Sequence, residues 1–559
     1  MPLNQGDRPQ IKLPIPNGPI TLSDRSVSMR ALTLAITTAL IISAPATTQA
    51  GTLPATINLS ELDGSNGFVV DGAAVYDRSG ISVSGAGDVN GDGIDDVIVG
   101  ASRADPNGIN SGAAYVIFGS ANGLPSPLDP SALDGTNGFV LNGEVGNDEA
   151  GGAVSAAGDI NGDGIDDLII GAGGADPNGD GSGRSYVVFG SKSVFPATLE
   201  LSTLNGVNGF ALNGEAVDDD SGDAVSAAGD VNGDGIDDLI IGAEGASPNG
   251  EYSGRSYVVF GSDQGFQSVF NLSSLDGSNG FAMNGAATYD NAGRSVSSAG
   301  DINGDGIDDV IIGATGEDSN EDSSGRAYVV FGSLQPFSTP IDLNSLDGTN
   351  GIVLTGLKEN TSSVFNVSAA GDVNGDGLDD LIIGDSGSRV HGIVRVGRSY
   401  VIFGSNGGLP SLFNMSMVNG SNGFVLNGEA AGDGAGRSVS GAGDVNGDGV
   451  DDFIIGASGA SPNGYDSGRS YVVFGSETGF PNPFNLSSLD GSNGFAMNGE
   501  AEFDRSGSRV SGAGDVNGDG IDDVIIGASS ATPNGNESGR TYVVFGKRTG
   551  VFADRFEAR

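Results

Sequence analysis

A nine-residue segment of the form Asp-x-Asn-Gly-Asp-Gly-x-Asp-Asp occurs seven times in this chain at an almost constant interval. The spacing is 71 residues except for one interval of 72, and the copies open at Asp88, Asp159, Asp230, Asp301, Asp372, Asp444 and Asp515. Such a period is typical of an architecture in which one supersecondary unit packs against copies of itself. Because the composition changes little between residues 57 and 546, we expect one repetitive body at residues 51–546.

Each repeat contains four short segments with the composition of β-strands. In the first repeat they are residues 81–86, 96–101, 113–119 and 138–142, and Asn-Gly, Asp-Gly and Ser-Gly turns separate them. The second and third segments are continuously apolar, which indicates strands buried on both faces. Four strands repeated seven times predict an all-β, seven-bladed β-propeller. A solenoid β-roll is the alternative, although solenoids favour shorter and more uniform repeats.

The last repeat has only three of these segments and ends near Gly546. Residues 66–70, Asn-Gly-Phe-Val-Val, precede the first repeat and match the fourth segment of the others. We therefore expect the N-terminal strand to complete the last blade and close the ring. Closure leaves only short, protected strand edges.

The acidic loop has the layout of a calcium site. Oxygen ligands at alternate positions of a tight loop can converge on one hard cation, and glycines permit the backbone to turn around it. An EF-hand would place its last carboxylate at position twelve, which here is Val99, so the last ligand must come from Asp96 at position nine. We expect Asp95, beside it, to accept hydrogen bonds from the loop backbone. Ordinary solvated Asp-Gly turns are the alternative, but four carboxylates in nine residues repel one another without a cation.

The predicted ligands are the side chains at positions one, three, five and nine and the carbonyl oxygen at position seven, with water completing the shell. Up to seven Ca²⁺ ions would be held by Asp88, Asn90, Asp92, Ile94, Asp96; Asp159, Asn161, Asp163, Ile165, Asp167; Asp230, Asn232, Asp234, Ile236, Asp238; Asp301, Asn303, Asp305, Ile307, Asp309; Asp372, Asn374, Asp376, Leu378, Asp380; Asp444, Asn446, Asp448, Val450, Asp452; and Asp515, Asn517, Asp519, Ile521, Asp523.

Composition excludes several classes of function. The formal net charge of −48 disfavours nucleic acid and anionic lipid as partners. The absence of cysteine excludes disulfides, thiolate metal sites and a cysteine nucleophile, and His391 is the only histidine. The sequence has no glycine-rich phosphate loop and no HExxH pattern. Paired carboxylates could serve a glycosidase, but the clustered acids are already assigned to metal, so we predict no catalytic residues.

Residues 1–50 have the features of a leader followed by a signal peptide. Met29-Arg30 precedes an apolar run at residues 31–45, and small residues lead up to Ala50, so Met29 is a possible true start. No other segment approaches 18 uncharged apolar residues, which predicts that the protein has no membrane span. We expect export to the cell surface or the medium. The tail at residues 547–559 is either an anchoring signal or a frayed end.

These motifs resemble the FG-GAP repeats of the integrin alpha-chain propeller, which also occur in many bacterial secreted proteins. The resemblance covers roughly residues 57–546 and is carried by the acidic loop and the Val-Ile-Val-Gly-Ala segment that follows it at residues 97–101. Ser79-Gly80 replaces the family's Phe-Gly, so we expect the bacterial secreted type rather than close kinship to animal integrins. The resemblance implies structural calcium on one face of a monomeric propeller and recognition of a protein or glycan on the opposite face.

The fifth repeat departs from the others in two loops expected on that opposite face. Residues 385–395 carry the extra residue of the 72-residue interval, and residues 357–360 replace the usual Asn-Gly-Glu-Ala. Lys358, Arg389, His391 and Arg395 would form a basic spot there, which is a candidate partner site; drift in an exposed loop is the alternative. The predicted function is a secreted calcium-binding adhesion or recognition module. The alternatives are a secreted hydrolase or carbohydrate-active protein on a propeller scaffold, and a self-assembling coat component.

Overall fold

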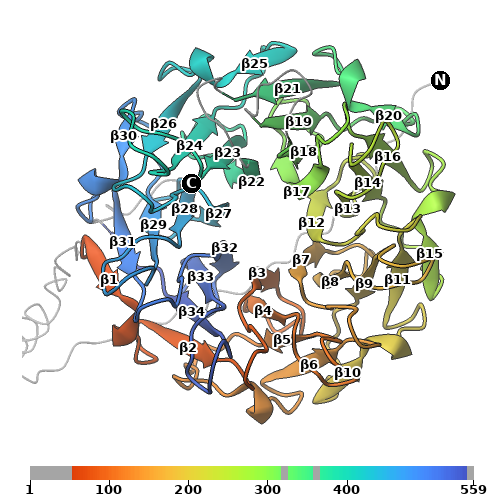
Figure 1. Ribbon diagram of the computed structural model, residues 1–559, viewed down its shortest axis with the longest axis horizontal. Helices are drawn as coiled ribbons and strands as arrows, with labels where there is room; N and C mark the ends of the chain where they lie inside the picture. Colours follow the sequence, from red (N-terminus) through yellow and green to blue (C-terminus); the bar gives the residue numbers. More distant parts are fainter. Residues whose placement is uncertain (1–52, 317–324, 357–364, 550–559) are drawn as a thin grey trace, which may run out of the picture. The chain divides into compact units, whose positions relative to one another are not determined.

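The computed structural model describes residues 53–316, 325–356 and 365–549, with the backbone alone described at Phe365. In this part of the chain seven sheets follow one another around a central axis (Figure 1). The predicted all-β, seven-bladed propeller is confirmed. The predicted leader and signal peptide at residues 1–50, the possible start at Met29 and most of the predicted tail lie outside the described residues.

Each blade is an antiparallel sheet of four strands, numbered here outward from the axis. The first strands are β3 (Ser82–Gly87), β7 (Ala153–Gly158), β12 (Ala224–Gly229), β17 (Ala292–Gly300), β22 (Phe365–Gly371), β27 (Ser438–Gly443) and β32 (Arg509–Gly514). The second strands are β4 (Asp96–Ala101), β8 (Asp167–Ala172), β13 (Asp238–Ala243), β18 (Asp309–Ala314), β23 (Asp380–Asp385), β28 (Asp452–Ala457) and β33 (Asp523–Ala528).

The outer half of each blade completes the sheet. The third strands are β5 (Ala113–Ile117), β9 (Arg184–Val188), β14 (Arg255–Val259), β19 (Arg326–Val330), β24 (Arg398–Ile402), β29 (Arg469–Val473) and β34 (Arg540–Val544). The fourth strands are β6 (Gly138–Asn142), β11 (Gly209–Asn213), β16 (Gly280–Asn284), β21 (Gly351–Thr355), β26 (Gly423–Asn427), β31 (Gly494–Asn498) and β2 (Gly67–Asp71).

Six blades gain a short parallel fifth strand that the sequence analysis did not predict. These strands are β10 (Thr198–Glu200), β15 (Val269–Asn271), β20 (Ile341–Asp342), β25 (Leu412–Asn414), β30 (Phe484–Asn485) and β1 (Thr56–Asn58). Each belongs to the connection between the third and fourth strands of the next blade, so each blade covers the outer edge of its neighbour. Covering the edge hides backbone groups that would otherwise pair with another chain.

A short 3₁₀ helix follows each fifth strand or its equivalent. These helices are η1 (Leu59–Glu61), η2 (Pro130–Ala132), η3 (Leu201–Thr203), η4 (Leu272–Ser274), η5 (Leu343–Ser345), η6 (Met415–Met417) and η7 (Leu486–Ser488). They are the only helices among the described residues. None is long and apolar enough to cross a bilayer.

The hydrophobic core lies between neighbouring blades. Every residue of β4 is buried, because the blades on both sides cover its two faces, as the continuous apolar run predicts. Phe139 on β6 stacks on Phe195 from the next blade, with ring centroids 4.3 Å apart, and the same stack is present at three other interfaces. Burying such a side chain contributes about 1.5–3 kcal/mol, so the interfaces between blades share the stability of the fold.

The two ends of the described chain meet in the last blade. Strand β2 pairs antiparallel with β34, with Gly67 opposite Val544 and Asp71 opposite Arg540, which confirms the predicted closure. Closure is more extensive than predicted, since β1 also pairs with β31 and covers the sixth blade. The N-terminal segment therefore serves two blades that are otherwise built from the C-terminal third of the chain.

Candidate metal loops and the opposite face

Each acidic loop joins the first strand of a blade to the second. In the first blade the strand pairing shifts register between Gly85 and Gly87, and the chain re-enters the sheet at Asp96. The same shift precedes the loop in the other six blades. Gly91 and Gly93 have φ values of 70° and 89°, in the left-handed region that favours glycine. The loop is a strand-to-strand turn, as the sequence predicts.

Hydrogen bonds from the loop backbone to its own carboxylates hold the turn. The Asp88 carboxylate accepts hydrogen bonds from the N–H groups of Asp92 (2.9 Å) and Gly93 (2.7 Å). The Asp92 carboxylate accepts one from the N–H of Ile94 at 3.1 Å. Asp88 and Asp92 therefore face the inside of the same turn.

Asp96 differs from the other acids of the loop because it is fully buried. Its carboxylate accepts hydrogen bonds from the N–H groups of Gly119 (2.9 Å) and Val89 (3.1 Å) and from the Asn90 amide (3.3 Å). Burial, together with the nearby charges of Asp92 and Asp88, raises the pKa of Asp96 from its usual value near 4 to about 8. A carboxylate in this position strongly favours a neighbouring positive charge.

The other six copies repeat this arrangement. Burial is the main cause of a raised pKa at each ninth-position aspartate, and acids at positions one and five of the same loop add to it. The pKa rises to about 8 at Asp167, Asp238, Asp309, Asp380 and Asp523, and well above its usual value at Asp452.

The donor set suits a hard divalent cation, but the carboxylates are not gathered around one point. All five predicted ligand positions offer oxygen, as Ca²⁺ requires. Across the described residues, however, no three acidic, histidine or cysteine side chains form a group that could hold a metal ion. Instead, loop N–H groups and the Asn90 amide occupy the carboxylate oxygens. Binding would require these side chains to exchange hydrogen bonds for the ion.

The aspartate at position eight connects neighbouring loops. The Asp166 carboxylate accepts a hydrogen bond from the N–H of Asp88, the first residue of the loop in the preceding blade, at 2.8 Å. The same bond, at 2.8–2.9 Å, is present at all seven junctions. Asp95 was predicted to bond to loop backbone, and it does so, but to the neighbouring loop.

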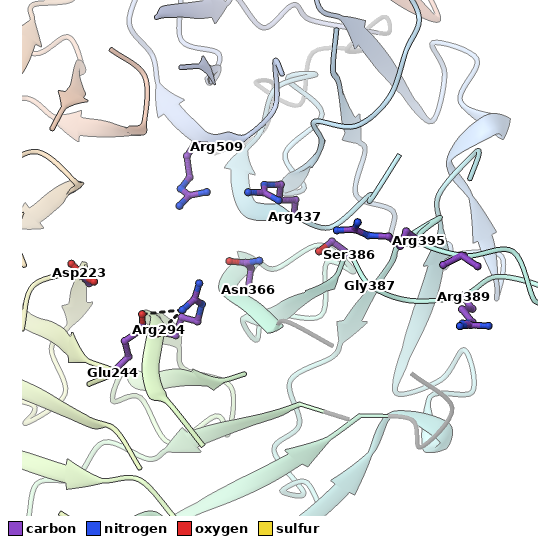
Figure 2. A pocket seen from close by; sticks show the side chains of 11 residues that line it. Asp223, Glu244, Arg294, Asn366, Ser386, Gly387, Arg389, Arg395, Arg437 and Arg509 are labelled. Carbon is purple, nitrogen blue, oxygen red and sulfur yellow. Dashed lines mark hydrogen bonds and ion pairs between the residues drawn. The ribbon is translucent and has the colours of Figure 1, made fainter. Parts of the chain in front are cut away.

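The loops between second and third strands, and those between blades, lie at the other end of each blade. Lys358 of the predicted basic spot lies outside the described residues. Arg389 and Arg395 line a cavity of about 720 Å³ on this face, whereas His391 is exposed and is not among the lining residues (Figure 2). The structure thus brings together two members of the predicted partner site.

The same cavity is lined by three arginines that the sequence analysis missed. They are Arg294 in β17, Arg437 immediately before β27, and Arg509 at the start of β32. Their signal in the sequence is weak, because each is one unusual residue in an otherwise regular repeat. Only the ring brings the first strands of three different blades to one opening.

Comparison with known proteins agrees with this geometry. Seven segments match the FG-GAP repeat family: residues 79–117, 150–188, 221–259, 292–330, 365–402, 435–473 and 506–544. Each segment begins at the first strand or a few residues before it and ends with the third strand. The family match therefore coincides with the inner three strands and the acidic loop of every blade.

Several larger proteins share part of this sequence. Integrin alpha pat-2 of Caenorhabditis elegans is 31% identical over 260 residues, which are 44% of this chain and 18% of that protein. Integrin alpha-5 of Xenopus laevis is 27% identical over 269 residues, 46% of this chain and 22% of that protein. Phosphatidylinositol-glycan-specific phospholipase D of Dictyostelium discoideum is 29% identical over 297 residues, 50% of this chain and 28% of that protein.

This chain thus spans less than a third of the length of each of these relatives. The expected kinship with a bacterial secreted type stays a prediction. The seven family matches, one in each blade, and the integrin relatives agree on the nature of the repeat. The chain is a seven-bladed β-propeller of FG-GAP repeats, of the integrin alpha type.

Proposed function

We propose that this chain is an exported propeller, stabilised by up to seven Ca²⁺ ions, that recognises a protein or glycan through the face opposite the acidic loops. The segment at residues 29–50 supports export. The integrin relatives support recognition outside the cell. The calcium has a structural role in this proposal, and the ligand is bound by exposed side chains at the other end of the blades.

The acidic loops support the calcium part of the proposal. Each would hold an ion through its aspartates at positions one, five and nine, its asparagine at position three and its carbonyl at position seven. The ion would supply the positive charge that the buried ninth-position carboxylate lacks. Asp96 and its six equivalents, each the first residue of a second strand, would then join the ion to that strand and so stiffen the base of each blade.

The recognition part rests on one observation: a constant backbone on the opposite face carries different exposed side chains. In five inter-blade turns, a residue with positive φ donates its N–H to a carbonyl oxygen of the neighbouring loop. These residues are Tyr76, Asn147, Asp218, Tyr289 and Phe503. Since the backbone contact is the same, the side chain is free to vary. A scaffold that presents variable exposed side chains is typical of binding surfaces.

A binding screen tests this proposal with variants that the backbone tolerates. Glycine accepts positive φ without strain, so Tyr289→Gly and Phe503→Gly remove two exposed aromatic rings and should leave the fold intact. The full chain is screened against glycan and protein arrays in calcium buffer. We expect the affinity for a specific ligand to fall about tenfold or more in the double variant, as for other aromatic anchors. Asn147→Gly is the control and should bind normally.

If every ligand that binds the wild-type chain bound the double variant equally well, this face would not be the recognition surface. Hydrolysis is the alternative function, favoured by the phospholipases D among the relatives. Incubating the full chain with each ligand and analysing the products by mass spectrometry distinguishes the two. Cleavage of a bound ligand would favour the hydrolase, and recovery of intact ligand would favour the recognition module.

A further inference from the structure

The cavity on the recognition face is cationic along one wall, although the whole chain is strongly acidic. Arg437 immediately precedes the first strand of the sixth blade, Arg509 begins the first strand of the seventh, and Arg395 comes from the irregular loop of the fifth blade (Figure 2). Asp223 and Glu244 lie across the cavity, where Glu244 pairs with Arg294 at 2.9 Å. Asn366 and Ser386, two neutral hydrogen-bonding side chains, line the space between the two walls.

Arg509 is a charged residue at a position where the other six blades have an uncharged one. In the strand pairing Arg509 lies opposite Gly527, the glycine near the end of the second strand. The residues at this position in the other blades are small and neutral: Ser82, Ala153, Ala224, Ser295, Asn366 and Ser438. The scaffold therefore does not need an arginine at this position, and its presence calls for another explanation.

Neither Arg437 nor Arg509 has an acidic partner within the described residues. Arg509 donates a hydrogen bond to the Ser508 carbonyl at 2.9 Å, and no hydrogen bond or ion pair holds the Arg437 guanidinium in this part of the chain. Solvent reaches both side chains through the cavity, yet surrounding protein and neighbouring arginines lower the pKa of each. Guanidinium groups gathered on one wall of a cavity, with no acid to neutralise them, favour an anion beside them.

We propose that Arg437 and Arg509, with Arg395 at the rim, bind a tetrahedral oxyanion of the phosphate or sulfate class carried by a small ligand. The planar guanidinium fork matches such an anion through two parallel N–H···O bonds. A small ligand fits better than a polyanion, because the net charge of −48 repels an extended acidic molecule, whereas a single anionic group near the arginines lies within one Debye length, about 8 Å.

The acidic wall limits the chemistry of the part of the ligand that is not the anion. Glu244 is engaged with Arg294, and the neighbouring Asp223 carboxylate can accept hydrogen bonds from hydroxyl groups. A neutral, hydroxyl-rich body bearing one phosphate or sulfate ester would satisfy both walls, which is the chemistry of a phosphorylated or sulfated saccharide. This inference rests on the proposed function, because it assigns a ligand class to the recognition face.

Isothermal titration calorimetry on the full chain in calcium-containing chloride buffer tests the inference. Sulfate is the free-ion probe and glucose 6-sulfate the ester probe, since sulfate does not precipitate calcium at the concentrations used; glucose is the neutral control. We expect Arg437→Gln/Arg509→Gln to weaken binding of the ester about tenfold or more, which is the loss typical of a charged hydrogen-bond partner. Arg103→Gln, which removes an exposed arginine outside the cavity, should change it less than twofold.

A second measurement needs no ligand. If the two guanidinium groups repel each other, the double variant should unfold at a higher temperature than the wild type in chloride alone, and Arg103→Gln should not. Ester binding tighter than sulfate binding supports a saccharide ligand, and equal binding supports the free ion. Binding that the double variant retains, or no binding of either probe by the wild type, overturns the inference. If the wild type binds neither probe but still binds a ligand that Tyr289→Gly/Phe503→Gly loses, the proposed function stands without this site.

Discussion

The Asp95 carboxylate accepts a hydrogen bond of 2.8 Å from the backbone N–H of Asp515, a residue 420 positions away in the sequence. Asp95 is at position eight of the first acidic loop and Asp515 opens the last one, so this bond crosses the junction at which the ring closes. The six other junctions have the same bond between consecutive repeats. Hydrogen bonds thus connect the seven loops in a closed ring around one end of the propeller.

Removing one of these seven hydrogen bonds should destabilise the fold. Asp95→Ala leaves the half-buried Asp515 N–H without its partner. Because water can partly reach this donor, the cost should be at the lower end of about 1–3 kcal/mol. Asp237→Ala removes the equivalent bond to Asp159 between the second and third blades. Because the junctions share one geometry, urea unfolding should show similar losses for both. A loss confined to Asp95→Ala would show that the closing junction depends on this hydrogen bond more than the other junctions do.

The glycine before each loop is constrained by the same contact. Gly514 has a φ of 70°, and a Cβ built there would lie 2.3 Å from the Asp95 carboxylate oxygen. Gly520 in the same loop has a φ of 81° but nothing within 4 Å of such a Cβ. Gly520→Ala should therefore cost about 1 kcal/mol for backbone strain alone. Gly514→Ala should cost about 1–3 kcal/mol more because of the clash, measured as the difference in unfolding free energy.

Equal losses for the two alanine variants would mean that the neighbouring loop can move away. Restoring space in the Gly514→Ala background with Asp95→Gly separates the two contributions, because it removes the clashing carboxylate and leaves the backbone strain. The second substitution should then cost less than it does in the wild-type chain. Such non-additivity is expected only for residues in direct contact.

Calcium should raise the unfolding temperature of the full chain in proportion to the logarithm of its free concentration. One site contributes about 2.7 kcal/mol when the free ion is 100 times its dissociation constant. Asp92→Ala removes a predicted ligand from one loop, and equilibrium dialysis should show one ion fewer per chain. Asp63→Ala, in an exposed turn outside the loops, is the control. An unchanged melting curve after thorough chelation would contradict the calcium proposal.

Asp223 should make the stability of the chain depend on pH. Solvent reaches its carboxylate through the cavity, yet close protein atoms, followed by the charges of Asp220, Glu244 and Glu149, raise its pKa from near 4 to about 7, against the opposing effect of Arg294. The folded state then holds a proton that the unfolded state releases. The stability associated with this proton is fully present below about pH 4 and is lost as the pH rises through about 7.

Asp223→Asn, which imitates the protonated side chain, isolates this effect. Below pH 4 the variant should unfold at the same temperature as the wild type. As the pH rises the variant should become the more stable of the two, and above about pH 7 the difference in unfolding temperature should stay constant. Asp176→Asn, at an exposed acid that does not line the cavity, is the control for removing one carboxylate. Differential scanning calorimetry across this range checks the prediction, and a constant difference at every pH would contradict it.

The propeller could be predicted because its determinants are local and repeated. The alternation of turns and apolar strands, the seven acidic loops and the match of residues 66–70 to the fourth strands all depend on short stretches of sequence. Each stretch was available seven times, so chance variation in one copy did not obscure the pattern. The fifth strands were missed because segments such as Thr198–Glu200 are short and gain strand structure only by pairing with the preceding blade.

The candidate sites divide in the same way. The sequence by itself determined the repeat, the strand-to-strand loop and its set of oxygen donors, because these are properties of neighbours along the chain. Only the tertiary structure decided that Asp95 bonds to Asp515 and that Arg437 and Arg509 share one cavity with Arg395. Closure of the ring brings together residues from different repeats, and no periodicity in the sequence specifies which of their side chains will meet.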